Sequence, residues 1–326
     1  MKLRTILPGL VAALGMCVLI LDSRTALIAA GQGLQLCLKT VIPSLFPFFL
    51  LSGILTGSLL GMELPVLRPV VRALGMPKGS ETLLVSGFLG GYPVGAKAVR
   101  DAWAQGKICK KDAERLLSFC NNAGPAFLFG MVGPMFSSNG HAWVLWGIHI
   151  VSALTAGWLL RKEPDSGAVS NFNQNTSISL AMTNAIKACA QVCGWVIAFR
   201  IICSFLERWI LWLLPLWAKV AVTGLLELAN GCLELKKISS ENVRFLLCSG
   251  ILSLGGFSIL MQTVSVTQGL HLTYCLQGKL MQTLFSLLLS LIFIKWISPL
   301  WLIPILLVIL PKKMGFRGSN PRKLAV

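Results

Sequence analysis

Long apolar runs alternate with short polar connections along this chain. The runs cover, in order, residues 6–21 extended through Ala30, 36–60, 141–160, 188–214 and 281–310. An α-helix of about 20 apolar residues crosses a hydrocarbon core of ~30 Å, and several of these runs reach that length. The pattern therefore predicts an all-α polytopic membrane protein.

The amino-acid composition strengthens this prediction. Of the 326 residues, 55% are hydrophobic and only 13% are charged. Soluble domains carry roughly 25% charged residues, so an ordinary soluble protein is excluded.

The first apolar run follows Lys2 and Arg4, which is the outline of a secretory signal peptide. No clear small-residue cleavage site ends the run, because Ala26 to Ala30 follow Asp22 and lead into more apolar sequence. We therefore interpret residues 1–35 as a retained N-terminal transmembrane helix.

Two apolar segments contain residues that interrupt a helix. Residues 82–105 begin apolar and break at the run Gly90-Gly91-Tyr92-Pro93-Val94-Gly95, where proline removes a backbone donor and each glycine weakens a helix by roughly 1 kcal/mol. A second break is predicted around Glu227–Gly231. Unwound backbone at membrane depth is tolerated only where protein or a wet cavity covers it, so both segments are expected to be re-entrant or broken hairpins.

These breaks belong to a weak internal match. Ser86-Gly87-Phe88-Leu89 aligns with Thr223-Gly224-Leu225-Leu226, and Gly124-Pro125 aligns loosely with Gly255-Gly256. Each half then contains a long helix, a broken segment, a helix with a glycine kink and a final helix. If the broken segments are re-entrant, an odd number of crossings separates the copies, which predicts two inverted repeats of the kind found in secondary transporters.

The expected boundaries follow from this repeat and from the one long polar stretch. They are a terminal helix over 1–35, a first repeat over 36–162, a polar linker with an amphipathic helix over 163–187, a second repeat over 188–310 and a basic tail over 311–326.

The chain carries 29 lysines and arginines against 12 aspartates and glutamates, a formal net charge of +17. A basic soluble protein would suggest nucleic-acid binding. Here the basic residues lie at the edges of apolar runs and no nucleic-acid-binding module is present. We therefore expect membrane lipids, and not nucleic acid, as their partners.

The basic residues also predict an orientation. With Lys2 inside, the connections that contain 68–78, 107–111 and 161–162 all lie inside, as the positive-inside rule requires. The same count places the basic residues of 312–323 outside. Two alternatives remain open: one broken segment crosses fully, or the first 38 residues are not a single span.

Glu227 is an isolated carboxylate in an apolar segment, and a charge at the bilayer centre is costly unless it faces a cavity or a partner. We expect it to couple a proton or cation. The alternatives are a structural partner for a basic residue and a position near the membrane interface.

Polar residues near the first break are the candidate substrate site. Asn121 and Asn122 are adjacent amides before Gly124-Pro125 and need hydrogen-bond partners, which either a polar ligand or the broken backbone would provide. Lys97 follows the first break and either meets an anionic substrate or snorkels to the interface.

Enzyme signatures are missing. The chain has no zinc-protease helix, nucleophile elbow, phosphate loop or dinucleotide fingerprint, and its three histidines have no metal-ligand spacing. We expect no catalytic residues, no metal and no cofactor. The oligomeric state stays open, a homo-oligomer being one alternative.

Three motifs resemble the sporulation integral membrane protein YlbJ family, which carries a nucleoside-recognition Gate domain distantly similar to concentrative nucleoside transporters. The motifs are Ser86–Lys97, Ala113–Asn122 and Gly124–Gly130, and the resemblance covers roughly residues 40–270.

The resemblance implies a transporter-like protein that moves a small anionic metabolite, dipicolinic acid, across the outer forespore membrane. The alternatives are transport of a nucleoside or other small metabolite, and a non-transporting assembly role in the spore envelope. Carried over by position, the implied substrate-binding residues are Gly91, Pro93, Gly95, Lys97, Asn121 and Asn122.

Overall fold

A computed structural model describes residues 3–295 except 60–61, 63, 168 and 170–176. Every regular element in this described part is helical, as the apolar runs predict. The α-helices are α1 (Leu3–Leu21), α2 (Ser23–Leu36), α3 (Ile42–Leu59), α4 (Arg68–Ala73), α5 (Glu81–Leu89), α6 (Val94–Ala104), α7 (Lys110–Leu116), α8 (Pro125–Phe127), α9 (Asn139–Leu159), α10 (Ile178–Trp209), α11 (Leu216–Leu226), α12 (Leu228–Leu235), α13 (Glu241–Leu254), α14 (Gly256–Val266) and α15 (Thr273–Phe293).

Five helical stretches in the described residues are long and apolar enough to cross a membrane. They are Ser23–Leu51, Gly140–Leu159, Ile178–Trp209, Glu241–Val266 and Thr273–Phe293. The protein buries between 22% and 50% of their most apolar windows, so much of their apolar surface faces outward. That surface requires a lipid environment, and the chain is an all-α polytopic integral membrane protein.

The N-terminal segment differs from the single helix expected over 1–35. Asp22 ends α1 and caps α2 by accepting a hydrogen bond from the Thr25 backbone N–H at 3.3 Å. Its carboxylate also lies 3.2 Å from the Arg208 guanidinium of α10. Helix α2 continues through a π-helical turn, Cys37–Val41, into α3, so the spanning stretch begins after Asp22.

Two other boundaries also differ. The helix expected over 188–214 begins ten residues earlier, at Ile178, so part of the expected linker 163–187 belongs to α10. The final helix, expected over 281–310, begins at Thr273. Residues 296–310 and the basic tail 311–326 lie outside the described residues.

Both expected breaks are present, and each separates a pair of short helices. The chain breaks between α5 and α6 at Gly90–Pro93 and between α11 and α12 at Glu227. A Cβ atom on Gly95 would lie 2.7 Å from the Gly87 Cα atom, and one on Gly231 would collide with the Gly224 Cα atom. Gly87 and Gly224 are the residues that the internal match aligns, so equivalent glycines bring the two arms of each hairpin together.

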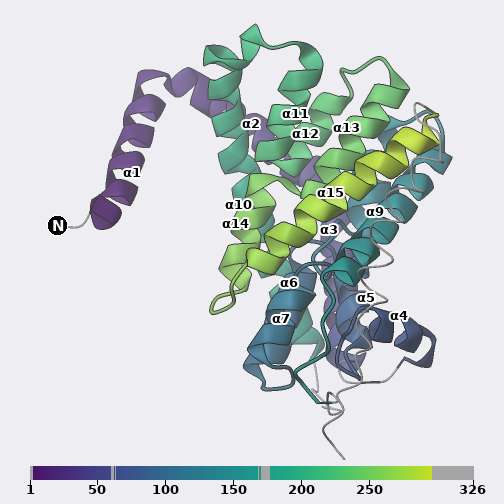
Figure 1. The fold of residues 1–326 in the computed structure, drawn as a ribbon. Helices are drawn as coiled ribbons and strands as arrows, with labels where there is room; N and C mark the ends of the chain where they lie inside the picture. Colours follow the sequence, from purple (N-terminus) through teal and green to yellow (C-terminus); the bar gives the residue numbers. More distant parts are fainter. Residues whose placement is uncertain (1–2, 60–61, 63, 168, 170–176, 296–326) are drawn as a thin grey trace, which may run out of the picture.

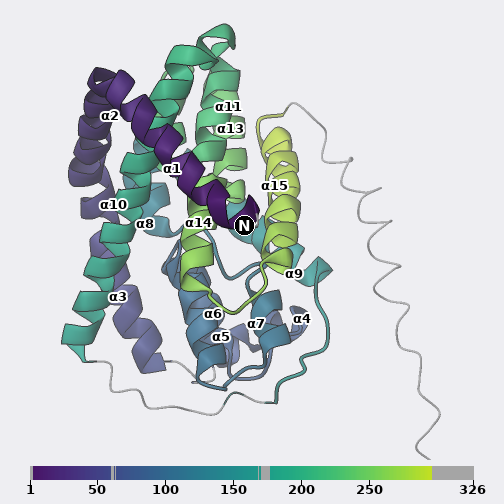
Figure 2. The same cartoon turned by 90° about the vertical axis from the view of Figure 1, so that its left-hand side faces the viewer.

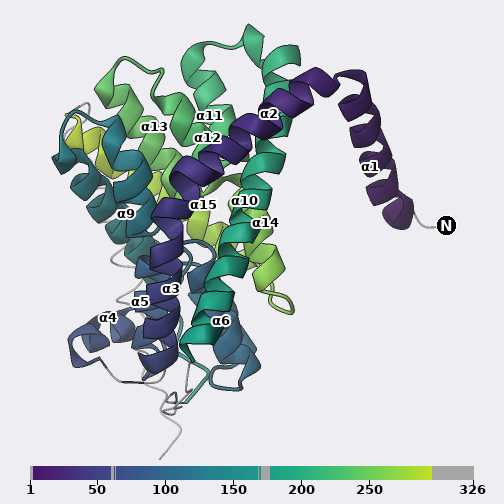
Figure 3. The same ribbon diagram turned by 180° about the vertical axis from the view of Figure 1, so that it is seen from behind.

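The two hairpins lie at opposite ends of the molecule. Helices α5 and α6 occupy one end, α11 and α12 occupy the other, and the same arrangement is visible from the side and from behind (Figures 1, 2 and 3). A second break packs on each hairpin, because Gly124 contacts Gly91 while Gly256 contacts the Gly224 backbone. The long helices enclose this centre, with α10 packed along α2 and α3, and α15 packed along α9 and α13.

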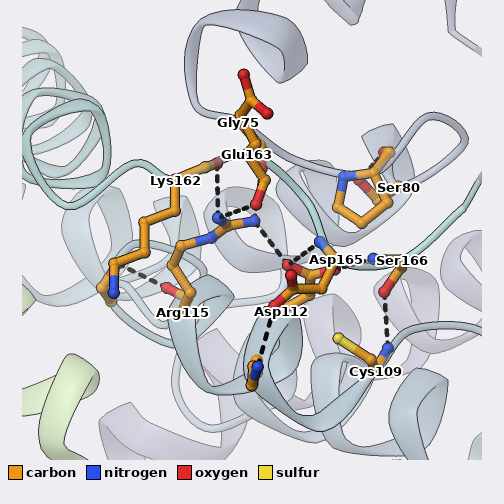
Figure 4. A network of polar contacts seen from close by, with 12 residues as sticks. Gly75, Ser80, Cys109, Asp112, Arg115, Lys162, Glu163, Asp165 and Ser166 are labelled. Carbon is orange, nitrogen blue, oxygen red and sulfur yellow. Dashed lines mark hydrogen bonds and ion pairs between the residues drawn. The ribbon is translucent and has the colours of Figure 1, made fainter. Parts of the chain in front are cut away.

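A buried polar network fixes the connection after α9 to α7 and to the turn after α4 (Figure 4). The Arg115 guanidinium donates to the Lys162 and Gly75 carbonyl oxygens, both at 2.6 Å, and lies 2.8 Å from the Asp112 carboxylate. Asp112 in turn accepts a hydrogen bond from the Ser166 backbone N–H at 2.7 Å. The network therefore holds the first part of the expected linker as ordered structure.

Burial by itself raises the pKa of the Asp112 carboxyl, but hydrogen bonds from Ser166 and Asp165 and the charge of Arg115 lower it on balance below its ordinary value of 3.8. A carboxyl whose pKa is lowered by folding stabilises the protein above its unfolded-state pKa. This stabilisation is lost as the pH falls through the folded-state value. The network is therefore expected to stay intact at neutral and mildly acidic pH.

Hydrogen exchange at the Ser166 backbone amide tests this expectation. After correction for intrinsic rates, protection should be constant between about pH 7 and about pH 5 and should fall only at lower pH. Asp112→Asn should speed exchange about tenfold at neutral pH, because it removes a charge-assisted acceptor. Asp165→Asn is the control, since its half-exposed carboxylate only approaches Lys111 at 3.8 Å. Equal exchange in Asp112→Asn and wild type would contradict the account.

Candidate functional site

The tips of the two hairpins face a common cavity at the centre of the molecule. The cavity measures about 40 Å³, enough for one or two water-sized groups. Its polar lining comes from Gly90, Gly91 and Tyr92 in the first hairpin, from Glu227 in the second and from Gln262 of α14. Apolar residues of α3, α8, α10, α12 and α14 line the remaining walls.

Glu227 lies at the second hairpin tip, where the chain leaves α11 in an extended conformation and enters α12. Its side chain is 2% exposed, and one carboxylate oxygen accepts hydrogen bonds from the Asn230 backbone N–H at 2.6 Å and the Asn230 side-chain amide at 2.9 Å. No ion pair in the described part of the chain includes Glu227. The carboxylate therefore has polar neighbours and faces a cavity without a basic partner there.

Gln262 adds a second oxygen to the cavity wall. Its side chain is fully buried, and its Oε1 atom has no hydrogen-bond partner among the described residues, while its amide nitrogen donates to Ser258 at 3.2 Å. A carboxylate and an unpartnered amide oxygen beside broken backbone are groups that a proton-carrying water or a small hard cation binds.

Asn121 and Asn122 lie in the unwound stretch after α7, close to the first hairpin. The Asn121 amide donates to Thr263 Oγ1 at 2.9 Å, and the Asn122 amide donates to the Phe119 carbonyl at 2.6 Å. The Asn121 carbonyl oxygen is buried without a partner in the described structure. Asn122 thus satisfies broken backbone in part, whereas Asn121 keeps a free acceptor.

The residues in and after the first break differ in whether they reach the central cavity. Gly91, with φ +72°, lines the central cavity beside Gly124, and Pro93 starts α6. Gly95 packs against the Cys120 carbonyl oxygen, the residue before Asn121, and so positions the unwound stretch. Lys97 is not brought to these residues, because its half-exposed side chain pairs with Asp101 at 2.6 Å, one helical turn further along α6.

A different lysine, Lys279 of α15, lies at the centre. It is 6% exposed, donates to the Tyr92 hydroxyl at 2.8 Å and to Gln282 Oε1 at 2.9 Å, and sits 4.8 Å from the Tyr92 ring centroid. Sequence reasoning missed Lys279 because the expected final helix began two residues after it. A lone lysine between Gln277 and Gln282 in an apolar run was the signal that could have found it.

Lys279, Gln282 and His149 connect the two halves of the chain. The Gln282 amide donates to Asn122 Oδ1 at 3.1 Å, and the Ala123 backbone N–H donates to His149 Nε2 at 3.1 Å. The unwound stretch after α7 is therefore held by side chains of α9 and α15. The unwound backbone thereby gains side-chain partners, which broken backbone needs wherever a bilayer surrounds it.

One metal-compatible group occurs in the described residues, away from this centre. Cys109, Asp112 and Asp165 offer ligand atoms within 4.8 Å of one another. Both Asp112 oxygens already accept hydrogen bonds or pair with Arg115 in the network of Figure 4. The network accounts for this cluster without a metal.

Fold and site together define a polytopic membrane protein in which two broken hairpins meet at a buried polar centre. The chain is similar to the sporulation integral membrane protein YlbJ of Bacillus subtilis (strain 168), with 34% identity over 139 residues. The match covers 41% of this chain and 33% of the relative, so the chain spans about a third of the relative's length, and the match is shorter than the expected 40–270. No family model and no solved structure matches.

Proposed function

We propose that this chain is a secondary transporter-like protein of a bacterial cell membrane, and not an enzyme, that moves a small anionic metabolite. The observation that carries the proposal is the meeting of two broken hairpins around Glu227 and the cavity it lines. Half-helices that meet near the bilayer midplane are the usual way in which transporters present ions and substrates to backbone groups.

The proposal includes two inverted repeats. Three features support it: the repeated order of helices, the equivalent glycines Gly87 and Gly224, and hairpins at opposite ends of the molecule (Figure 1). Two related hairpins of this kind let one half of a protein rock against the other around a fixed site.

We assign different roles to Glu227 and Lys279, two buried charged residues near the hairpin tips. Glu227 binds the coupling proton or cation, because it faces the central cavity and lacks a basic partner in the described structure. The positive charge for the substrate comes from Lys279, and not from Lys97 as the sequence suggested. Asn121 is a further polar contact. The positive charge of Lys279 suits a carboxylate.

The relative is a sporulation protein by name, which supports a role for this chain in spore formation. Dipicolinic acid is then the proposed substrate and the outer forespore membrane the proposed location, through a Gate-type hairpin region. Dipicolinate is a small planar dianion, so its carboxylates complement a site with a buried lysine.

Deletion of the gene that encodes this chain, in its own organism, tests this function. Dipicolinate should accumulate in the mother cell while the spore core is depleted, because synthesis continues without transfer. Normal core dipicolinate with a defective spore envelope would contradict transport and favour a non-transporting assembly role. Normal core dipicolinate with altered nucleoside uptake would redirect the substrate assignment.

A further inference from the structure

A second and larger cavity lies between α11, α14 and α15. Its volume is about 320 Å³. Leu225, Phe257 and Leu276, at its rim, are 48%, 51% and 47% exposed, and the last two belong to spanning stretches. The rim is therefore on the lipid-facing side of the protein, within the described residues.

The deep end of this cavity is polar, in contrast to its apolar walls. Lys279, Asn121 and Thr263 line it, and each of these side chains is more than nine-tenths buried. Lys279 has two neutral acceptors, Tyr92 and Gln282, but none of the ion pairs of the described chain includes it. A buried ammonium group without a carboxylate is costly, so an anion that reaches it is bound strongly.

Asn121 adds a second requirement. Its amide nitrogen is used by Thr263, whose hydroxyl donates to the Ile259 carbonyl, and its Oδ1 atom is left without a donor. A ligand that satisfies both groups carries an anionic acceptor for Lys279 and, next to it, a hydrogen-bond donor for Asn121.

We propose that this cavity binds an apolar hydroxycarboxylate that enters from the bilayer. The carboxylate pairs with Lys279, the neighbouring hydroxyl donates to Asn121 Oδ1, and the apolar body lies between α11, α14 and α15. A cavity of this volume holds a body and head of about ten non-hydrogen atoms. The inference goes beyond transport, since binding requires no movement across the membrane.

Titration calorimetry of the full chain in lipid nanodiscs tests the proposal, with empty nanodiscs as the blank. The probes are 2-hydroxyoctanoate, octanoate, which lacks the hydroxyl, and 1-octanol, which lacks the charge. Affinity should fall in that order, with a loss of at least about tenfold when the charge is absent. Equal affinity for 1-octanol and octanoate would overturn the assignment of Lys279, and equal affinity for the two acids would overturn that of Asn121.

Three substitutions test whether the ligand binds in this cavity. Lys279→Met should weaken 2-hydroxyoctanoate binding at least about tenfold, while Lys187→Met, the same change at an exposed lysine of α10, should leave it unchanged. Leu276→Trp fills the mouth without touching a charge and should also prevent binding, which keeps the test valid if Lys279→Met fails to fold. Unchanged binding in Leu276→Trp would overturn the proposal.

Failure of this binding proposal can be distinguished from failure of the proposed transport function. Binding that depends on Lys279 in a protein that transports nothing would leave this inference standing alone. Transport of dipicolinate by a protein that does not bind 2-hydroxyoctanoate would overturn it and leave the proposed function intact.

Discussion

Glu227→Gln is expected to reduce gradient-driven anion uptake into proteoliposomes at least about tenfold. Glu227 is the only acid that lines the central cavity among the described residues, and glutamine cannot carry a coupling proton or neutralise a cation. Glutamine keeps the shape of the side chain and an oxygen that accepts the Asn230 N–H, so the start of α12 is retained. Uptake should also lose its dependence on the pH or cation gradient.

Glu207→Gln is the matched control. Glu207 lies on α10, is partly exposed and approaches Arg200 at 3.6 Å, away from the cavity lining. The pair is only partly exposed but lies outside the cavity lining, so uptake should be unchanged. If Glu227→Gln transports as well as wild type with the same pH dependence, the coupling role is wrong and the carboxylate only caps α12.

Gly95→Ala is expected to destabilise the protein by at least about 2 kcal/mol, because overpacking in a rigid region forces the backbone to move. Its methyl group would collide with the Cys120 carbonyl oxygen and lie 2.7 Å from the Gly87 Cα atom. Both neighbours are backbone atoms and cannot rotate away. The midpoint of thermal unfolding in detergent should fall, and the unwound stretch that carries Asn121 should be displaced.

Gly194→Ala is the control for a glycine-to-alanine change, and we expect it to change stability in the opposite direction. Gly194 lies inside α10, where a new Cβ atom would have nothing within 4 Å. Alanine favours a helix over glycine by up to ~1 kcal/mol, so stability should be equal or higher. A Gly95→Ala protein as stable as Gly194→Ala would contradict the close packing of α5, α6 and the unwound stretch.

Local sequence signals were sufficient to predict the hairpins. Glycines and a proline at 90–95, and a lone acid at Glu227, disfavour a continuous apolar helix, and the structure breaks at both places. The aligned Gly87 and Gly224 each lie where the two arms of a hairpin come close together. These features depend on backbone chemistry within a few residues, which a sequence displays directly.

Features that depend on distant partners could not be predicted in the same way. Lys279 meets Tyr92 across 187 positions of sequence, and no periodic pattern encodes that contact. Lys97 is close to the break in sequence, but the direction of its side chain follows from the α6 face it shares with Asp101. The helix break at Asp22 depends on one polar residue in an apolar run. Hydropathy averaged over a whole helix length does not reveal such a single residue.

Counterflow tests the central claim most directly, because it does not depend on which ion is coupled. Proteoliposomes loaded with unlabelled dipicolinate are diluted into a trace of labelled dipicolinate without any imposed gradient. The account predicts transient, saturable accumulation of label that exceeds that in protein-free vesicles and is lost when the internal dipicolinate is omitted. Label that enters at the same rate in protein-free vesicles, and is insensitive to the internal dipicolinate, would contradict it.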